Sequence, residues 1–343
     1  MTKNTRNLLL LAASIFAVRA FIQRRREADL GGQIVLITGG SRGLGLALSH
    51  EFGKHGCRLA LCARDADELA RARQDLEAQG YEVFTSVCDL TDTAQVERLI
   101  ADVTAHYGQI DILVNNAGII EVGPVQNMQR RDFEDAMNVD FWGGLDTILG
   151  VLPQMRARSS GRIVNITSIG GKVAFPHLLP YAAAKFAATG LSEGLHSELM
   201  QDGITVTTVV PGLLRTGSYF NALFKGNKTG EFAWFSVGDN LPGGSMSAER
   251  AAREIVAATR RGDAERILSV PASLLSRAQG LAPNTTSRLL TLINNAVLPP
   301  PSTELGSDTN SPGKDADPSV PLHPAFDAMT TLGRSAADRL NET

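Results

Sequence analysis

Three side chains in the middle of the sequence have the types and spacing to move a proton at a substrate oxygen. Ser168 follows a short apolar run, and Tyr181 and Lys185 lie four positions apart, which places them on one face of a helix. Reducing a carbonyl requires a proton donor at its oxygen, oxidising an alcohol requires a base there, and a serine hydroxyl would hold the developing oxyanion. The usual tyrosine pKa of roughly 10 is too high for a base near neutrality, so a neighbouring ammonium would have to lower it. Taken alone, the Tyr–Lys spacing also fits an ordinary solvated helix surface.

A glycine-rich turn lies earlier in the chain, between an apolar run at 34–38 and a helical pattern that begins at Gly43. Glycines let a diphosphate approach the backbone, and the helix N-terminus offers free N–H groups and a positive dipole. The order strand, turn, helix therefore predicts a dinucleotide site. The residues expected on its phosphate side are Thr38, Gly39, Ser41, Arg42, Gly43, Leu44 and Gly45.

The end of the next apolar run, 58–63, indicates which dinucleotide binds. NAD sites carry a carboxylate there for the ribose hydroxyls, whereas this run ends in an alanine followed by Arg64. Arg64 and Arg42 could hold a 2′-phosphate, so we expect NADP(H) rather than NAD(H). In the alternative, Asp65 binds the ribose of NAD, although it is also well placed as a helix N-cap. Asp89 would accept a hydrogen bond from the adenine or simply cap the next turn.

Short apolar runs alternate with helical patterns from residue 31 to residue 270. Such runs, buried on both faces, indicate a parallel sheet covered by helices on both sides. We predict an α/β fold with a single doubly wound Rossmann domain, a mostly parallel seven-stranded sheet, an N-terminal hydrophobic segment and a C-terminal extension. The expected strands are 34–38, 58–63, 82–88, 112–115, 162–167, 205–210 and 266–270, and the main expected helices are 43–55, 93–107, 128–152, 179–200 and 247–261.

Six motifs, in order, resemble the short-chain dehydrogenase/reductase family. They are Thr38 to Gly45, Asn115 to Gly118, Asn138, the trio Ser168, Tyr181 and Lys185, the pair Pro211-Gly212, and Thr216. The resemblance implies that Tyr181 is the general acid/base, that Lys185 binds the nicotinamide ribose and lowers the tyrosine pKa, and that Ser168 holds the substrate oxygen. It also implies that the Asn138 backbone supports a water in a proton relay; in the alternative, Asn138 is an ordinary helix residue.

The same resemblance extends the cofactor site and suggests the reaction. The further cofactor-binding residues that it implies are Asp89, Leu90, Asn115, Ala117, Gly118, Tyr181, Lys185, Pro211, Gly212, Leu214 and Thr216, the last of which could instead be a plain loop hydroxyl. The implied activity is oxidation or reduction at CH–OH and C=O groups, in a homodimer or homotetramer by analogy. The alternatives are an NADP(H)-binding regulatory or scaffold protein without turnover and a non-redox enzyme on the same fold.

The segment after Pro211, about 213–245, resembles a substrate lid and is rich in aromatic residues. They are Tyr219, Phe220, Phe224, Phe232, Trp234 and Phe235. Because aromatics are scarce elsewhere, we expect a small, lipophilic carbonyl or alcohol substrate. The same rings could instead pack the lid onto the core or contact a membrane or partner.

The two ends of the chain differ from the middle. Residues 1–30 contain a hydrophobic stretch, 8–22, that is shorter than the roughly 20 residues needed to span a bilayer. A membrane anchor, a packed soluble helix and a cleaved signal peptide all remain open, and we expect membrane association with the catalytic domain in the cytoplasm. Residues 271–298 predict an amphipathic helical extension that packs on the domain or touches the same membrane. Residues 299–343 predict a largely disordered tail with a weak helix near 325–340.

Charge and cysteine content exclude other classes of function. A formal net charge of −3 argues against a general nucleic-acid binder, which would usually be basic. The three cysteines form no zinc-like pair, so we expect no metal site and three reduced thiols.

Overall fold

The computed structural model describes residues 27–241, 243–316 and 324–342. Its centre is a seven-stranded sheet with the order β11-β7-β6-β4-β1-β2-β3, in which every neighbouring pair is parallel. The strands are β1 (Ile34–Thr38), β2 (Arg58–Ala63), β3 (Val83–Val87), β4 (Ile112–Asn115), β6 (Gly161–Ile166), β7 (Ile204–Val210) and β11 (Glu265–Ile267). The predicted doubly wound Rossmann architecture is confirmed.

Alternating side chains of each strand pack on opposite faces of this sheet. In β1, Val35 and Ile37 join one apolar cluster and Ile34 and Leu36 join the other. The first cluster includes residues of α2 (Gly43–Lys54), α3 (Ala66–Ala78) and α9 (Ala248–Arg261), and the second includes residues of α4 (Thr93–Tyr107), α6 (Gly143–Ala157) and α7 (Leu179–Leu199). The central strands are buried on both faces, which explains why they are apolar throughout rather than alternating.

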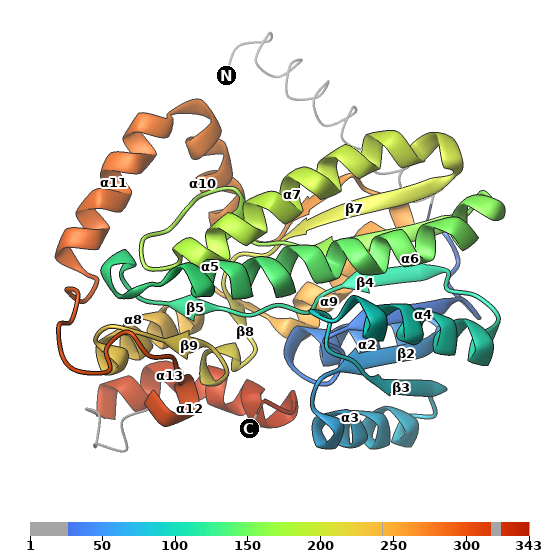
Figure 1. Ribbon diagram of the computed structural model, residues 1–343, viewed down its shortest axis with the longest axis horizontal. Helices are drawn as coiled ribbons and strands as arrows, with labels where there is room; N and C mark the ends of the chain where they lie inside the picture. Colours follow the sequence, from blue (N-terminus) through green and yellow to red (C-terminus); the bar gives the residue numbers. More distant parts are fainter. Residues whose placement is uncertain (1–26, 242, 317–323, 343) are drawn as a thin grey trace, which may run out of the picture.

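The helix expected over 128–152 consists of α5 (Arg130–Met137) and α6 joined by one π-helical turn, Asn138–Trp142. A π turn inserts an extra residue into the helical repeat and is frequently found at functional sites. In Figure 1, α5, α6 and α7 run across the front of the sheet. The chain also forms short 3₁₀ turns at Val125–Asn127, Ile169–Gly171, Met200–Asp202 and Ser218–Phe220.

The lid is built beyond the carboxyl edge of the sheet around α8 (Lys228–Asn240). Two small sheets hold it: β8 (Leu214–Arg215) pairs with β10 (Met246–Ser247), and β9 (Leu223–Phe224) lies between β5 (Glu121–Val122) and β12 (Ser311–Pro312). The stretch after the last large strand forms two helices, α10 (Val270–Leu281) and α11 (Pro283–Ala296), which project to one side of the domain (Figure 1).

The C-terminal segment, for which composition predicted disorder, contains ordered structure in the part that is described. After β12 come α12 (Gly313–Ala316) and α13 (Pro324–Arg339), and α13 lies against α8 (Figure 1). Ala336, Ala337 and Leu340 are buried, so a few small apolar residues dock this segment despite its polar composition.

The N-terminal hydrophobic stretch lies outside the described residues, which begin at Glu27. Among the helices that the structure does describe, none has the length and apolar character needed to cross a bilayer.

Candidate active site

A single long cavity of about 1500 Å³ follows the carboxyl edge of the sheet from the glycine turn to the lid. Its walls include most of the side chains predicted to bind a cofactor. Three of those predicted residues, Thr38, Gly45 and Asn115, do not line the cavity but lie behind it. A parallel sheet places ligands at this edge because the loops that follow its strands converge there.

Ser168, Tyr181 and Lys185 meet in the middle of this cavity. Ser168 follows β6, and its Oγ accepts a hydrogen bond of 2.9 Å from the backbone N–H of Gly170. Tyr181 and Lys185 lie on the first turns of α7, with the Lys185 ammonium 5.6 Å from the centre of the Tyr181 ring. Lys185 is buried, and its Nζ donates to the Ile166 carbonyl at 3.3 Å. The helical spacing predicted from the sequence therefore brings these groups together.

The electrostatics of this trio include a fourth group, Asp140 on the π turn. The Lys185 Nζ lies 3.5 Å from Asp140 Oδ1, which also accepts from the Ile119 N–H at 3.0 Å. Burial raises the pKa of Asp140 to about 6, while Lys185 opposes this rise. Burial alone would lower the pKa of Lys185, but Asp140 and Tyr181 hold it above its usual value.

Tyr181 keeps its proton in this environment. Burial raises its pKa, Asp140 raises it further, and Lys185 together with a hydrogen bond from Ser168 lowers it without cancelling the rise. The lowering by Lys185 has the expected direction, but the net shift is upward. A protonated phenol beside a serine hydroxyl is a proton donor for an oxygen placed between them.

The glycine turn is held by side chains from the neighbouring strand loop. Thr38 Oγ1 accepts from the N–H groups of Asn116 and Ala117 at 3.0 and 3.1 Å, and Asn116 Nδ2 donates to the Thr38 and Gly39 carbonyls at 3.1 and 3.0 Å. Gly39 has a φ of +63°, and a Cβ there would lie 2.9 Å from the Ala117 backbone. A side chain at Gly45 would collide with the Gly39 carbonyl. Both positions therefore require glycine.

Asn115 ties the sheet to α6 rather than facing the cavity. Its Nδ2 donates to the Gly144 carbonyl at 3.2 Å and to Asn165 Oδ1 at 3.0 Å, and its Oδ1 accepts from Thr147 Oγ1 at 2.6 Å. It thus joins two neighbouring strands and a helix at the floor of the site.

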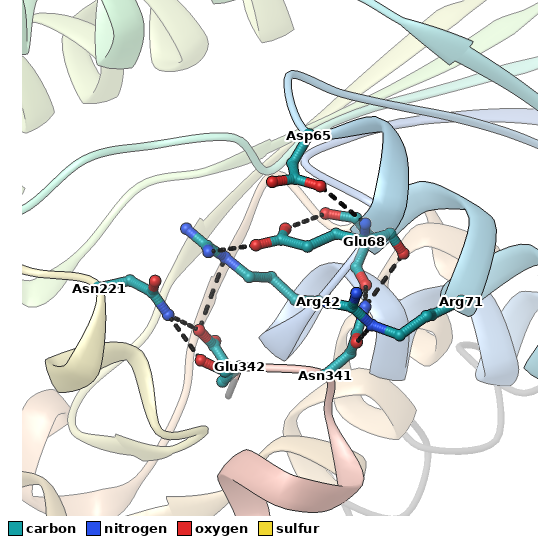
Figure 2. Close-up of polar contacts among 8 residues, drawn as sticks. Arg42, Asp65, Glu68, Arg71, Asn221, Asn341 and Glu342 are labelled. Atoms are coloured by element: carbon teal, nitrogen blue, oxygen red, sulfur yellow. Dashed lines mark hydrogen bonds and ion pairs between the residues drawn. The ribbon is translucent and has the colours of Figure 1, made fainter. Parts of the chain in front are cut away.

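Arg42 and Arg64, the two predicted phosphate ligands, both line the cavity, but Arg42 already has partners. Its Nη1 donates to Glu68 Oε1 at 2.9 Å (Figure 2). Ser41 Oγ donates to the other oxygen of Glu68 at 3.0 Å. Arg64 is exposed. Asp65 caps α3 by accepting from the Glu68 N–H at 2.8 Å, which confirms the N-cap interpretation.

Asp89 and Leu90 line the cavity just after β3. Asp89 Oδ1 accepts from the Thr91 N–H at 3.0 Å and from the Thr91 hydroxyl at 2.9 Å. The side chain therefore caps the turn, which is the alternative offered for it, while lying at the cavity wall.

The opposite wall is formed by the loop after β7. Pro211, Gly212, Leu214 and Thr216 all line the cavity, and Thr216 Oγ1 accepts from the Ser218 N–H at 3.1 Å. Ala117 and Gly118 line the floor near Lys185. The structure thus gathers residues from the loops after β1, β2, β3, β4, β6 and β7 at one edge of the sheet.

Comparisons with known proteins assign this arrangement to a family. Residues 33–222 match the family described as short chain dehydrogenase. The chain is 36% identical over 252 residues to a dehydrogenase/reductase SDR family protein 7-like of Anopheles gambiae, covering 72% of this chain and 78% of that protein. The chain belongs to the short-chain dehydrogenase/reductase family. Members of this family are oxidoreductases that act on carbonyl and alcohol groups with a nicotinamide cofactor.

Two further similarities bear on the chemistry of this short-chain dehydrogenase/reductase. A putative ketoacyl reductase of the granaticin polyketide synthase of Streptomyces violaceoruber is 37% identical over 185 residues, covering 53% of this chain and 68% of that protein. A gluconate 5-dehydrogenase from Burkholderia cenocepacia, solved in complex with NADP and tartrate, superposes with a TM-score of 0.62 at 26% identity, covering 72% of this chain and 97% of that one.

The residues present fit a dinucleotide along most of the cavity. The glycine turn leaves room for a diphosphate at the N-terminus of α2, and the cavity continues from there to Tyr181. At one point the fit fails: Glu342, from the end of the described chain, also lines the cavity beside Arg42. This residue was not among those predicted from the sequence.

Asn138 is the predicted catalytic residue that does not line the cavity. Its side chain is exposed, and its backbone carbonyl accepts from the Gly143 N–H within the π turn. Two positions later, Asp140 is the group that reaches Lys185. The sequence offered no signal for Asp140, because the residue touches Lys185 only through the π turn.

The lid aromatics divide into two groups. Tyr219, Phe224 and Phe232 are almost completely buried in an apolar cluster of the lid. Only Trp234 and Phe235 line the cavity. The packing interpretation is therefore confirmed for the first group, whereas the expectation of a lipophilic substrate stays a prediction.

Proposed function

We propose that this short-chain dehydrogenase/reductase uses NADP(H) to interconvert a carbonyl and a secondary alcohol, with Tyr181 as the general acid/base. The observation that carries the proposal is that Ser168 and Tyr181 both line the cavity beside the buried Lys185 ammonium, which lies 5.6 Å from the centre of the Tyr181 ring. A proton donor, an oxyanion-binding hydroxyl and a fixed cation at one point are what the addition of hydride to a carbonyl requires.

The nicotinamide, when bound, supplies or accepts the hydride. In the reductive direction Tyr181 donates its phenolic proton to the substrate oxygen, and Ser168 donates a hydrogen bond to the same oxygen. The Gly170 N–H donates to the Ser168 oxygen, so the hydroxyl proton, which otherwise faces Tyr181, is available to a substrate oxygen placed between the two side chains. Lys185 stabilises the phenolate that remains, and Asp140 holds the ammonium in place. Burial raises the pKa of Tyr181 and Lys185 lowers it, so the ammonium favours the phenolate that remains after proton transfer.

NADP(H) is favoured over NAD(H) by the charges at the end of β2. Ala63 stands where an acidic residue would bind the ribose, and Arg64 is exposed at the cavity wall. Asp65 is engaged as a helix cap. The NADP in the complex of the Burkholderia cenocepacia gluconate 5-dehydrogenase is consistent with this preference.

A lipophilic substrate is favoured by the lid end of the cavity. Its wall there consists largely of apolar side chains from the lid, the loop before α7 and the α10–α11 pair. They include Phe175, Leu178, Leu213, Ala233, Trp234, Phe235, Leu275 and Ile293. We infer a bulky ketone or secondary alcohol, because such a wall gains free energy from apolar area rather than from polar contacts.

We propose that the N-terminal stretch associates with a membrane, with α10 and α11 as the alternative contact. These helices expose large apolar side chains, among them Val270, Leu274, Leu281, Leu289 and Leu292. Such a patch marks a surface that contacts apolar material. For the proposed dimer or tetramer, the candidate contact residues are the exposed Trp142 at the end of the π turn, Leu149 on α6 and Phe186 on α7.

The decisive experiment compares Tyr181→Phe with the wild-type protein. With a panel of bulky apolar ketones followed at the NADPH absorbance, we expect the variant to lose turnover by about 10²- to 10⁴-fold while keeping its NADPH affinity. Tyr81→Phe is the matched control, because Tyr81 packs against α2 at Gly53 and does not line the cavity. Equal turnover in the Tyr181 variant and the wild type would refute the catalytic role, and NADPH binding without any turnover in either protein would favour a regulatory protein.

A further inference from the structure

The last described residues lie directly across the glycine-rich turn. The Gly43 N–H, at the start of α2, donates to the Leu340 carbonyl at 2.8 Å. Asn341 Nδ2 donates to the Ser41 and Glu68 carbonyls at 2.9 and 3.0 Å. Figure 2 shows Asn341 and Glu342 side by side against the turn, with Arg42 between Glu68 and Glu342. Segments nearly 300 positions apart in the sequence therefore form one polar cluster.

Glu342 places a carboxylate at the N-terminus of α2, where the glycine turn is expected to hold the diphosphate of the cofactor. Its side chain is only 5% exposed, and one oxygen lies 3.6 Å from Arg42 Nε. Asn221 Nδ2 donates to the same oxygen at 2.7 Å. A Cβ at Gly43 would collide with this carboxylate, so the carboxylate fills the space that the glycine leaves open. The positive end of α2 and a guanidinium attract an anion there, whether it is a carboxylate or a phosphate.

We propose that residues 340–342 are an intramolecular competitor of the nicotinamide cofactor and must leave the glycine turn before the cofactor binds. The Gly43 N–H cannot donate to Leu340 and to a phosphate oxygen at once. The Glu342 carboxylate and a diphosphate would also repel each other in the same buried space. The protein is thereby held in a closed state that cofactor binding opens.

This contact is also coupled to the lid. Residues 340–342 directly follow α13, which packs on α8, and Asn221 belongs to the lid loop. A side chain at Gly217 would collide with Ala337, so the docked helix fits closely against this loop. Release of the segment would therefore loosen the lid wall when the cofactor enters.

The expected effect is a change in cofactor affinity. When only a fraction of the molecules is open, the apparent dissociation constant rises in inverse proportion to that fraction. Deleting residues 340–343 should tighten NADPH binding about tenfold or more, and Glu342→Ala should give a large part of this gain. Asp338→Ala is the control, because Asp338 is exposed on the same helix, and it should leave the affinity unchanged.

Two measurements test the proposal without relying on turnover. Calorimetric titration of the full chain and the variants with NADPH gives the affinities, and hydrogen exchange reports the amides of Gly43 and residues 336–342. We expect NADPH to increase exchange in 336–342 while protecting Gly43. Weaker or unchanged NADPH binding in both Glu342→Ala and the deletion variant, or unchanged exchange in 336–342 on saturation, would overturn the proposal. Thermal unfolding checks that each variant is folded, and loss of turnover alone would concern only the proposed reaction.

The substrate end of the cavity contains Asp239, a buried acidic side chain. Asp239 lies on α8, lines the cavity and is 6% exposed. Within the described ranges it makes no hydrogen bond or ion pair, and burial raises its pKa to about 8. It is close enough to raise the pKa of Tyr181. A carboxyl group buried without a partner costs free energy unless a ligand satisfies it.

We infer that Asp239 is a specificity-determining residue that binds a hydrogen-bond donor on the substrate, away from the reacting carbonyl. This inference rests on the proposed function and narrows its substrate class to bulky ketones or alcohols with a second polar group. The donor is a hydroxyl or an amino group, since either satisfies the carboxyl oxygens.

Ligand binding can be followed by the fluorescence of Trp234, which lies in the same cavity wall. Replacing the exposed Trp142 by Phe leaves Trp234 as the one tryptophan of the sequence. In this variant, fluorescence titration compares 2-decalone, which has no hydrogen-bond donor, with a ring-hydroxylated 2-decalone and an amino-2-decalone, which each carry one donor group. We expect the hydroxyl or the amino ketone to bind at least about tenfold more tightly than 2-decalone, and Asp239→Leu to remove this difference. Equal binding of all three, no binding of either donor ketone, or a preference retained in Asp239→Leu would overturn the inference. Because the readout is binding, an inactive protein would count against the proposed reaction and not against Asp239.

Discussion

The buried ion pair between Lys225 and Asp132 links the lid to the domain, and we expect its loss to lower the free energy of unfolding. Lys225 follows β9 in the lid, Asp132 lies in the first turn of α5, and both side chains are fully buried. The Lys225 Nζ donates to both carboxylate oxygens at 2.7 and 2.8 Å, and Asp132 Oδ2 also accepts from the Gln129 N–H at 2.6 Å. Lys225→Met removes both bonds and leaves a buried carboxylate without its cation.

The size of the stability loss in Lys225→Met follows from these contacts. Two hydrogen bonds to a charged group contribute about 1.5–3 kcal/mol each, and breaking a buried pair by removing one partner typically costs about 3–5 kcal/mol. We therefore expect Lys225→Met to lower the free energy of unfolding by about 3–5 kcal/mol, which for a domain of this size lowers Tm by roughly 10 °C. Nearby Glu121, whose pKa burial raises to about 7, adds a second carboxyl group to the same region.

Urea and thermal unfolding of the variant give the assay. Lys54→Met is the matched control, since Lys54 is 58% exposed and its pair with Glu51 should contribute less than about 1 kcal/mol. Adding Asp132→Asn to Lys225→Met should restore part of the lost stability, because the uncompensated charge is then gone. A loss below about 1 kcal/mol in Lys225→Met, or no recovery in the double variant, would refute this account of the pair.

Three further predictions concern the cofactor and the membrane. Arg64→Asp should shift the ratio of NADPH to NADH affinity toward NADH by about tenfold or more, because it removes a phosphate ligand and supplies a ribose acceptor; unchanged affinities for both cofactors would contradict the assignment. Docking of residues 340–342 should weaken as pH rises. Burial raises the pKa of Glu342 to about 7 in the docked state, although Arg42 and Asn221 lower it and Glu68 raises it further. Protonation of Glu342 therefore stabilises the docked state fully below about pH 4.5, and this stabilisation is lost as pH rises through about 7. The gain in NADPH affinity on deleting 340–343 should therefore be larger at pH 6 than at pH 8, and an equal gain at both would count against it. Deleting residues 1–26, which leaves the buried Leu30 and the contacts of Glu27 and Ala28 in place, should release the protein from membranes in a flotation assay without loss of activity, whereas a truncated protein that still floats would place the contact on α10 and α11.

The sequence by itself determined the parts of the site that depend on neighbours in the chain. The apolar runs fixed the strands, since a strand buried on both faces must be apolar along its length. The glycine turn before α2 and the four-residue spacing of Tyr181 and Lys185 follow from backbone geometry alone, as does the Asp65 cap.

Tertiary structure alone decided which groups surround these residues. Asp140 reaches Lys185 only because a π turn shifts the helix, and Glu342 reaches Arg42 only because α13 docks on the lid. The separation of the lid aromatics into packed rings and cavity-lining rings likewise depends on how α8 sits against its neighbours. Local periodicity reports the face on which a residue lies, whereas the contacts and burial that set its pKa come from segments distant in sequence, which only the folded packing brings together.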